Sequence, residues 1–379
     1  MPYITLRQSP RYHQMTLDEF LFSPSPQPYL LTANETNTRT YLADRVPDKL
    51  QTIFRPQYAI GLLNEFNATT KRLRSVPRKS LYREFYIPKK SGGFRRIDAP
   101  NVELMDALRR LKTLFETEFH ALYHTSAFAY IPGRSAIDAV KRHQQNESRW
   151  FAKFDLSDFF GSTTPAFVLT SLSRVFPFSE IVKTDSGLNA LQTALDLGFL
   201  DGGLPQGTPL SPMLTNLIMI PIDYALYNTF RQDHFVYTRY ADDFIISSRR
   251  AFDVHKAEEH INEAMRLFGA PYRIKAEKTR YGSSAGSNWN LGVMLNKDNQ
   301  ITIGAKKKRQ FKAMLTSYVL DRKNGRPWEI SDVRVLDGFW HYYHMVEGKP
   351  IDDIVSAIGR KFHADIPALL HADLRTPAS

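Results

Sequence analysis

The 379-residue chain contains no cysteine, which excludes disulfides, thiolate metal sites and cysteine nucleophiles. It also lacks an apolar run of about 18 residues, the length that a membrane-spanning helix requires. The most apolar stretch, PMLTNLIMIPIDYALY (212–227), is interrupted by Thr, Asn, Pro and Asp. The first residues, MPYITLRQSPRYHQ, have no apolar core of the kind found in secretory signals. We therefore expect a cytoplasmic protein with no membrane partner.

Acidic residues are outnumbered, with 39 Asp and Glu against 50 Lys and Arg, which gives a formal net charge of +11. An excess of this kind indicates a polyanionic partner, nucleic acid before an anionic membrane. The hydrophobic fraction of 42% is that of a globular protein with a sizeable core. Basic residues and aromatics are densely interleaved in KRLRSVPRKSLYREFYIPKKSGGFRR (71–96), which makes nucleotide or phosphate binding an alternative of equal weight to a merely solvated face.

Two adjacent carboxylates interrupt an apolar segment. FVYTRYADDFIISS (235–248) is rich in Phe, Val, Tyr and Ile and predicts a strand or hairpin, yet Asp242 and Asp243 stand in its middle. Like charges side by side repel one another and are costly to desolvate. We expect a bound cation to offset that cost.

A third carboxylate occurs upstream in a similar setting. Asp155 lies at the end of WFAKFDL (150–156), a predicted strand. If this strand lies beside the one carrying Asp242 and Asp243, the three carboxylates converge. Oxygen ligands without Cys or regularly spaced His suit Mg²⁺. The pattern therefore predicts a two-metal site for phosphoryl transfer, with ions about 3.5–4 Å apart.

Hydrophobic periodicity and turn residues predict several other elements. These are a basic hairpin over 81–100, a helix over 102–124, a helix capped by Ser135, a long apolar helix within 198–227, a strand over 289–295, and helices over 305–320 and 333–348. The helices over 305–320 and 333–348 follow a loop-rich N-terminal part of the chain and a central part that contains both helices and strands.

Six segments together resemble the motifs of bacterial reverse transcriptases of the group II intron and retron kind. They occur in the family's order over roughly 80–345: RRIDAP, FAYIPGRSAIDAV, FDLSDFFGS, GLPQGTPLSP, YADD, and EKT followed by LGVML. Any one of these motifs is weak, whereas the ordered set is specific.

The resemblance implies an α+β right-hand polymerase with fingers, a palm built from an antiparallel sheet with helices, and a helical thumb. The implied boundaries are 1–70 for an N-terminal extension, 71–150 for the fingers, 151–300 for the palm with some fingers insertions, and 301–379 for the thumb.

The resemblance also assigns the catalytic centre. Asp155, Asp242 and Asp243 would be catalytic, and with the backbone carbonyl of Leu156 they would hold two Mg²⁺ ions, for which Mn²⁺ is an alternative. Phe160 matches the position that screens the sugar 2′ carbon, and the neighbouring Phe159 is available for the core.

Other matches concern the nucleotide and the nucleic acid. The implied substrate-binding residues, besides Phe160, are Gln206 on a glycine-rich loop, Arg95 and Lys89 (or Lys90) for the triphosphate, Lys278 near the leaving pyrophosphate, and Tyr240 at the primer terminus. The implied nucleic-acid-binding residues are Arg134 and the thumb cations Lys306, Lys307, Lys308 and Arg309.

The expected reaction is RNA-directed DNA synthesis from deoxynucleoside triphosphates, leaving DNA or an RNA–DNA hybrid. By analogy, a structured non-coding RNA serves as template, and the protein acts in antiviral defence. The Val-Thr-Gly triplet usual in retron enzymes is missing, and no maturase or RNase H region is evident, so a stand-alone enzyme is expected.

Three alternatives stay open. A template-independent or protein-primed DNA polymerase would use the same site. An RNA-binding scaffold with an inactive site is disfavoured by the intact aspartates. An RNA-dependent RNA polymerase is disfavoured by YADD and by Phe160. The sequence leaves the oligomeric state open.

Overall fold

The structure, a computed structural model, describes residues 54–89, 92–284 and 291–375. The predictions for 1–53, for Lys90 and for the start of the 289–295 strand lie outside these residues. The strands are β1 (Tyr82–Pro88), β2 (Phe94–Pro100), β3 (Trp150–Asp155), β4 (Val236–Tyr240), β5 (Asp243–Ser248), β6 (Arg280–Ser283), β7 (Met294–Leu295) and β8 (Ile301–Thr302). The helices are α4 (Pro56–Thr69), α5 (Lys71–Arg74), α6 (Val102–Thr113), α7 (Ala136–Gln145), α8 (Pro165–Leu172), α9 (Phe178–Ile181), α10 (Asp185–Asp196), α11 (Leu210–Ile218), α12 (Ile220–Gln232), α13 (Val254–Leu267), α14 (Ala305–Lys323), α15 (Ile330–Glu347), α16 (Lys349–Phe362) and α17 (Ile366–Arg375).

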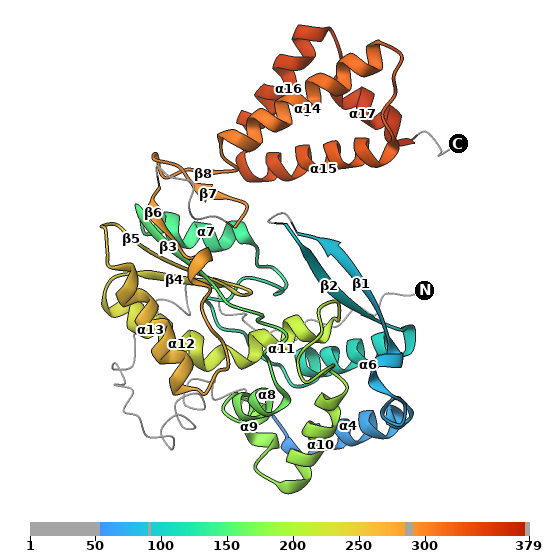
Figure 1. Ribbon diagram of the computed structural model, residues 1–379, viewed down its shortest axis with the longest axis vertical. Helices are drawn as coiled ribbons and strands as arrows, with labels where there is room; N and C mark the ends of the chain where they lie inside the picture. The colour runs from blue at the N-terminus through green and yellow to red at the C-terminus, as the bar shows by residue number, and fades with distance from the viewer. Residues whose placement is uncertain (1–53, 90–91, 285–290, 376–379) are drawn as a thin grey trace, which may run out of the picture.

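A four-stranded antiparallel sheet, ordered β4-β5-β3-β6, forms the centre of the molecule (Figure 1). Side chains alternate between its two faces, as the period of a strand requires. Phe154 and Phe244 face a large core shared with the helices below the sheet. Phe151 and Ile245 belong to a second core shared with α7 and the C-terminal helices. The expected α+β class with an antiparallel sheet is confirmed.

The basic hairpin forms as predicted. β1 and β2 pair antiparallel from Tyr82 opposite Pro100 to Pro88 opposite Phe94. Most of its side chains are exposed, and it extends beside the central body toward the C-terminal helices (Figure 1). Its base is anchored, because the Asn101 amide donates to the Leu81 carbonyl at 2.7 Å.

The predicted helices form with two corrections. The apolar helix within 198–227 is two helices, α11 and α12, since Pro221 in the first turn of α12 cannot continue the preceding hydrogen-bond ladder. The helix expected over 102–124 ends earlier. α6 stops at Thr113, a single π-helical turn follows, and His120 has a left-handed φ of 50°. Ser135 caps α7 in a capping box with Asp138, as expected.

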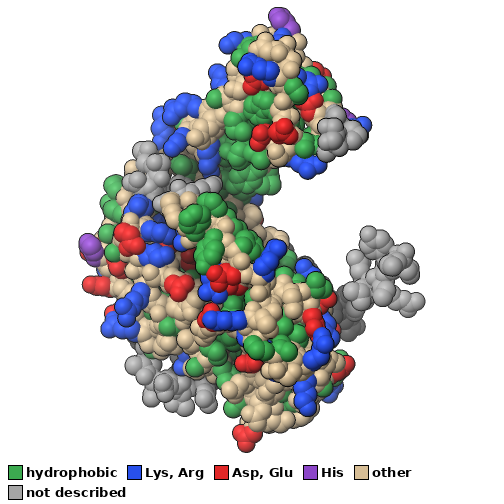
Figure 2. Space-filling view, turned by 45° about the vertical axis from the view of Figure 1, so that its right-hand side comes forward, with side chains coloured by type: hydrophobic (Ala, Val, Ile, Leu, Met, Phe, Trp, Pro, Cys, Tyr) green, Lys and Arg blue, Asp and Glu red, His purple; other side chains and the backbone are tan. Residues whose placement is uncertain are grey.

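The four C-terminal helices α14–α17 pack on one another and on α7 and the β7–β8 ribbon. A space-filling view shows the molecule hollowed between these helices and the central body (Figure 2). Within the residues described above, no helix combines the length and apolar character that crossing a bilayer requires.

Candidate active site

The three predicted aspartates meet at one end of the central sheet. Asp155 is the last residue of β3 and lies directly opposite Asp243, the first residue of β5, so their side chains share one face. Asp242 occupies the tight turn between β4 and β5, next to Ala241 with a left-handed φ of 57°. The Leu156 amide donates to the Asp242 carbonyl at 3.2 Å, which ties this turn to the end of β3.

Lysine side chains neutralise the facing carboxylates. Lys153 Nζ lies 2.8 Å from Asp243 Oδ2, and Lys278 Nζ lies 3.1 and 3.2 Å from the two oxygens of Asp155. Lys275 approaches Asp155 to 3.4 Å. Lys278 was singled out in the sequence, but Lys153 and Lys275 were not. The available signal for Lys153 was its position two residues before Asp155, on the same face of β3.

Burial disfavours the ionised form of two of the aspartates, Asp242 and Asp243. It raises the pKa of Asp243 to about 6, although Lys153 partly opposes the rise. Burial, followed by the nearby charge of Asp155, also raises the pKa of Asp242. Burial lowers the pKa of Lys278, but its contacts with Asp155 outweigh this effect and leave that pKa raised. The site therefore favours added positive charge.

The carboxylates of this site are suitable ligands for a hard divalent cation, but their side chains are not arranged around a common point in this structure. Carboxylate oxygens from Asp155, Asp242 and Asp243 are the ligands that Mg²⁺ prefers. Across 54–89, 92–284 and 291–375, no group of three or more His, Cys, Asp or Glu side chains is arranged to hold a metal ion. The ammonium groups of Lys153 and Lys278 instead contact the oxygens that a cation would use.

The turn after β3 and the glycine-rich loop before α11 press their backbones together. A methyl group on Gly203 would lie 2.1 Å from the Gly161 carbonyl oxygen, so only glycine permits this approach. The next residue, Leu204, donates its amide to the Phe160 carbonyl at 3.0 Å. Phe159 is buried, whereas Phe160 is partly exposed, and its contact with substrate stays a prediction.

The same loop also contacts the hairpin. The Gln206 carbonyl accepts the Asp98 amide of β2 at 2.7 Å, and Gly207, with φ 118°, lies where a side chain would collide with the Asp98 carbonyl. The structure therefore brings the hairpin, the loop of Gln206 and the turn of Phe160 together.

The predicted triphosphate contacts lie on the hairpin. Arg95 is exposed on β2, opposite Ile87, and Lys89 is exposed at the tip, where its amide donates to the Gly93 carbonyl. Tyr130 is an addition that the sequence did not indicate. Burial raises its pKa, and the charges of Asp242, Tyr240 and Arg95 act on its phenol.

Tyr240, the predicted primer-terminus residue, ends β4 opposite Asp243 and is partly exposed. Burial and then the phenol of Tyr240 raise the pKa of Tyr342 on α15.

The predicted nucleic-acid-binding residues fall into two groups. Lys306 and Arg309 are exposed on the first turns of α14. Lys307 contacts the Gly292 carbonyl and Lys308 pairs with Glu347, so these two cations are engaged within the protein.

Arg134 is also engaged within the protein. Its Nη1 donates to the carbonyls of His124 at 2.6 Å and Ala127 at 2.7 Å. Nucleic-acid binding by Arg134 stays a prediction.

Comparison with known proteins gives one family match and several relatives. The family model described as "Reverse transcriptase (RNA-dependent DNA polymerase)" matches residues 87–313. The Escherichia coli protein "Retron Ec83 reverse transcriptase" is 28% identical over 268 residues, which cover 68% of this chain and 81% of that protein. "Retron Mx162 reverse transcriptase" of Myxococcus xanthus is 27% identical over 78% of this chain and 62% of that protein. These similarities exist although the chain lacks the Val-Thr-Gly triplet.

Solved structures overlap more loosely. A telomerase from Candida albicans, solved with a fragment of telomeric RNA, has a TM-score of 0.43 at 10% identity, covering 79% of this chain and 66% of that one. Overlap at this level adds no detail about the site.

Proposed function

The chain belongs to the reverse transcriptase family, the RNA-dependent DNA polymerases, and has their right-hand fold; from this premise we propose that it copies RNA into DNA at the three-aspartate site. The observation that carries the proposal is the register of β3 and β5, which sets Asp155 opposite Asp243 beside the turn of Asp242. The reaction is attack of a primer 3′-hydroxyl on the α-phosphate of a deoxynucleoside triphosphate, with release of pyrophosphate.

Asp155, Asp242 and the Leu156 carbonyl would hold the divalent cations, Mg²⁺ or alternatively Mn²⁺, with Asp243 beside them. When bound, such ions activate the attacking hydroxyl and stabilise the leaving oxygen. For these ions to bind, Lys278 has to release Asp155. Its Nζ then lies free beside the site, where it can approach the leaving pyrophosphate.

The surrounding residues orient the nucleotide. Phe160 lies against the 2′ carbon of the sugar and leaves no room for a 2′-hydroxyl. Gln206 contacts the incoming nucleotide. Arg95 and Lys89 on the hairpin bind the triphosphate, as a guanidinium fork and a point charge. Tyr240 supports the primer terminus.

We assign the fingers to 71–150, the palm to 151–300 with some fingers insertions, and the thumb to 301–379, after an N-terminal extension over 1–70. Lys306 and Arg309 then face the backbone of the template–primer duplex. The template is a structured non-coding RNA, and the setting is antiviral defence; both rest on the family resemblance.

Extension of a primed RNA template by the purified protein with Mg²⁺ and deoxynucleotides tests the proposal. Asp242→Asn is expected to lower the rate by at least about 10³-fold. The matched control Asp298→Asn changes an exposed aspartate in the β7–β8 turn and is expected to retain the rate.

Sequencing the product separates the remaining alternatives. DNA complementary to the RNA supports templated synthesis. DNA without a complement, or DNA attached to protein, favours the untemplated or protein-primed polymerase. No product with any template, with or without the RNA that copurifies, contradicts the proposal.

A further inference from the structure

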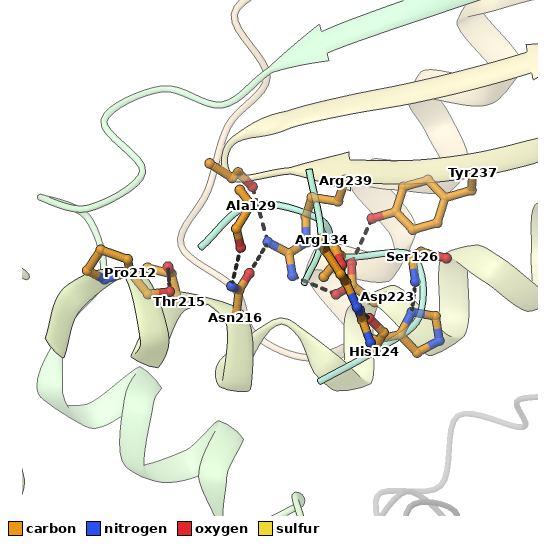
Figure 3. Close-up of polar contacts among 12 residues, drawn as sticks. His124, Ser126, Ala129, Arg134, Pro212, Thr215, Asn216, Asp223, Tyr237 and Arg239 are labelled. Carbon is orange, nitrogen blue, oxygen red and sulfur yellow. Dashed lines mark hydrogen bonds and ion pairs between the residues drawn. The ribbon is translucent and has the colours of Figure 1, made fainter. Parts of the chain in front are cut away.

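A fully buried salt bridge lies behind the turn that carries Asp242. Arg239 and Asp223 are both 0% exposed, and the guanidinium meets the carboxylate at two points, Nε to Oδ1 at 2.8 Å and Nη2 to Oδ2 at 2.7 Å. Tyr237 adds its hydroxyl to Asp223 Oδ1 at 2.8 Å (Figure 3). Asp223 lies on α12 and Arg239 on β4, so the pair links a helix to the strand that leads into the turn.

Further contacts fix Arg239 on its remaining sides. Its Nη1 donates to Asn216 Oδ1 of α11 at 3.1 Å, and Asn216 in turn donates to the Ala129 carbonyl at 2.7 Å (Figure 3). The Arg239 amide donates to the Ser126 carbonyl at 2.7 Å, and its carbonyl accepts the Phe128 amide at 2.9 Å. The guanidinium therefore has little freedom to move.

The same guanidinium reaches the turn itself. Nη1 donates to the Ala241 carbonyl at 3.2 Å. Ala241 has a left-handed φ of 57°, a conformation that residues with a Cβ rarely adopt unless their surroundings impose it. Its carbonyl belongs to the peptide that joins it to Asp242, so holding this oxygen fixes the plane from which the Asp242 side chain departs.

Burying a charge pair is seldom the most stable arrangement of a core, because desolvation offsets the attraction. Here the pair supports one arginine whose remaining donor reaches the backbone beside a catalytic aspartate. We propose that Arg239 is a positioning residue, which directs the Asp242 carboxylate into the site by holding the Ala241–Asp242 peptide. The expected effect of Arg239 on the rate rests on the proposed function, whereas its effect on the position of the Asp242 carboxylate does not.

Arg239→Lys tests the inference, because lysine keeps the charge beside Asp223 but cannot also reach Asn216 and Ala241 as a fork. Asn216→Ala is the milder second variant, since it leaves the salt bridge intact and removes one anchor of Nη1. Tyr237→Phe is the matched control. It removes a buried hydrogen bond to Asp223 without touching the turn.

The readouts are kcat and KM for deoxynucleotide, the melting temperature, and Mn²⁺ binding measured by electron paramagnetic resonance. In Arg239→Lys we expect kcat and Mn²⁺ affinity to fall about 10- to 100-fold with KM nearly unchanged, because a displaced catalytic group costs rate rather than substrate binding. Asn216→Ala should show the same pattern more weakly, and Tyr237→Phe should lower only the melting temperature.

If Arg239 has a merely structural role, the losses of kcat and Mn²⁺ affinity in all three variants should be proportional to their losses of melting temperature. That result overturns the inference. If Arg239→Lys does not fold, an Asn216→Ala protein with unchanged kcat and Mn²⁺ affinity overturns it as well. If wild-type protein makes no DNA, the proposed function fails. The Mn²⁺ affinities of wild type and Asn216→Ala still decide the positioning role.

Discussion

The ammonium nitrogen of Lys278 lies 3.1 and 3.2 Å from the two carboxylate oxygens of Asp155. A second lysine, Lys153, lies 2.8 Å from one carboxylate oxygen of Asp243, Oδ2. The protein thus supplies its own positive charge to a buried acidic cluster, and we expect the fold to form without a bound cation. We expect chelation to stop DNA synthesis while leaving the melting temperature of the wild type nearly unchanged.

Lys153→Met should make stability depend on divalent cations. Without its ammonium group, Asp243 is a buried carboxylate lacking its closest counter-charge, which costs about 1–3 kcal/mol of unfolding free energy. Denaturant unfolding with EDTA and then with Mg²⁺ measures this cost and its recovery. The control Lys183→Met removes the more exposed ion pair with Glu180, and its effect is expected to stay within about 0.5 kcal/mol. Equal losses in the two variants would contradict the expectation.

Gly203→Ala should separate two motifs of the site. Its methyl group would lie 2.1 Å from the Gly161 carbonyl oxygen, so the loop has to move and the bond from Leu204 to Phe160 is lost. We expect kcat/KM to fall about 10²-fold, as it does when a positioned group shifts by about 1 Å.

Gly61→Ala on α4 is the matched control for this change. Nothing lies within 4 Å of the added methyl group, and alanine stabilises helices by up to about 1 kcal/mol relative to glycine. Activity should stay at the wild-type level. If Gly203→Ala is as active as Gly61→Ala, the close approach of the two backbones has no part in catalysis.

Phe160→Ala should relax discrimination against ribonucleotides. Removal of a partly exposed ring opens space beside the sugar, so the ratio of kcat/KM for deoxy- over ribonucleotide is expected to fall about 10- to 100-fold. The control Phe159→Leu changes the buried neighbour and should affect the melting temperature but leave the ratio as it is. An unchanged ratio in Phe160→Ala would remove Phe160 from the specificity site.

His143 should make the protein sensitive to mild acid. It is fully buried, with ring nitrogens 2.6 Å from the Ser247 hydroxyl and 2.8 Å from that of Thr238, and burial lowers its pKa to about 3. The unfolded state takes up a proton near pH 6.5 and the folded state does not, so stability falls as pH drops from 6.5 toward 3.

At pH 5 this difference amounts to about 2 kcal/mol relative to neutral pH. Denaturant unfolding at pH 7 and pH 5 measures it. His143→Gln should lose this part of the pH dependence, whereas a change at the exposed His371 should keep it. The same slope in His143→Gln and wild type would show that His143 does not cause it.

The cations at the start of α14 should divide by function. Lys306→Gln with Arg309→Gln removes two exposed charges and should lower the salt dependence of template–primer binding by about one to two units of slope without changing the melting temperature. Lys308→Gln breaks the pair with Glu347 and should lower the melting temperature instead. Template–primer binding as a function of salt concentration, together with the melting temperature, checks both variants. A lower salt slope in Lys308→Gln and a lower melting temperature in the double variant would exclude the assignment of Lys306 and Arg309 to nucleic-acid binding.

Much of this arrangement could be predicted from local sequence. The apolar composition of 235–248 and 150–156 predicts the strands, and the expectation that the two strands lie side by side places Asp155 near Asp242 and Asp243, as the register of β3 and β5 has it. Pro221 is also a visible signal for the break between α11 and α12, although the largely apolar stretch around it favours a single helix.

Pairings between distant residues could not be predicted in the same way. Lys275 meets Asp155 only because its segment runs back along β3, and Asn216 meets Arg239 only after α11 packs under the sheet. The sequence around a charged residue does not indicate which residue it pairs with, because the partner is set by the register and packing of elements far apart in sequence. The contacts of Arg239 with Asp223 and Asn216 therefore could not be predicted from sequence, whereas the position of Lys153 two residues before Asp155 on β3 was a usable signal.

The core beneath the C-terminal helices is also one wall of the active site. Phe151 on β3 and Ile245 on β5 belong to the same cluster as Leu336 and Leu370, which lie beyond the family match that ends at residue 313. A fragment cut at that boundary would keep the three aspartates of the candidate site, yet it would lose much of the apolar cover on one side of the sheet. The apolar packing against these strands thus extends beyond the span that matches the family model.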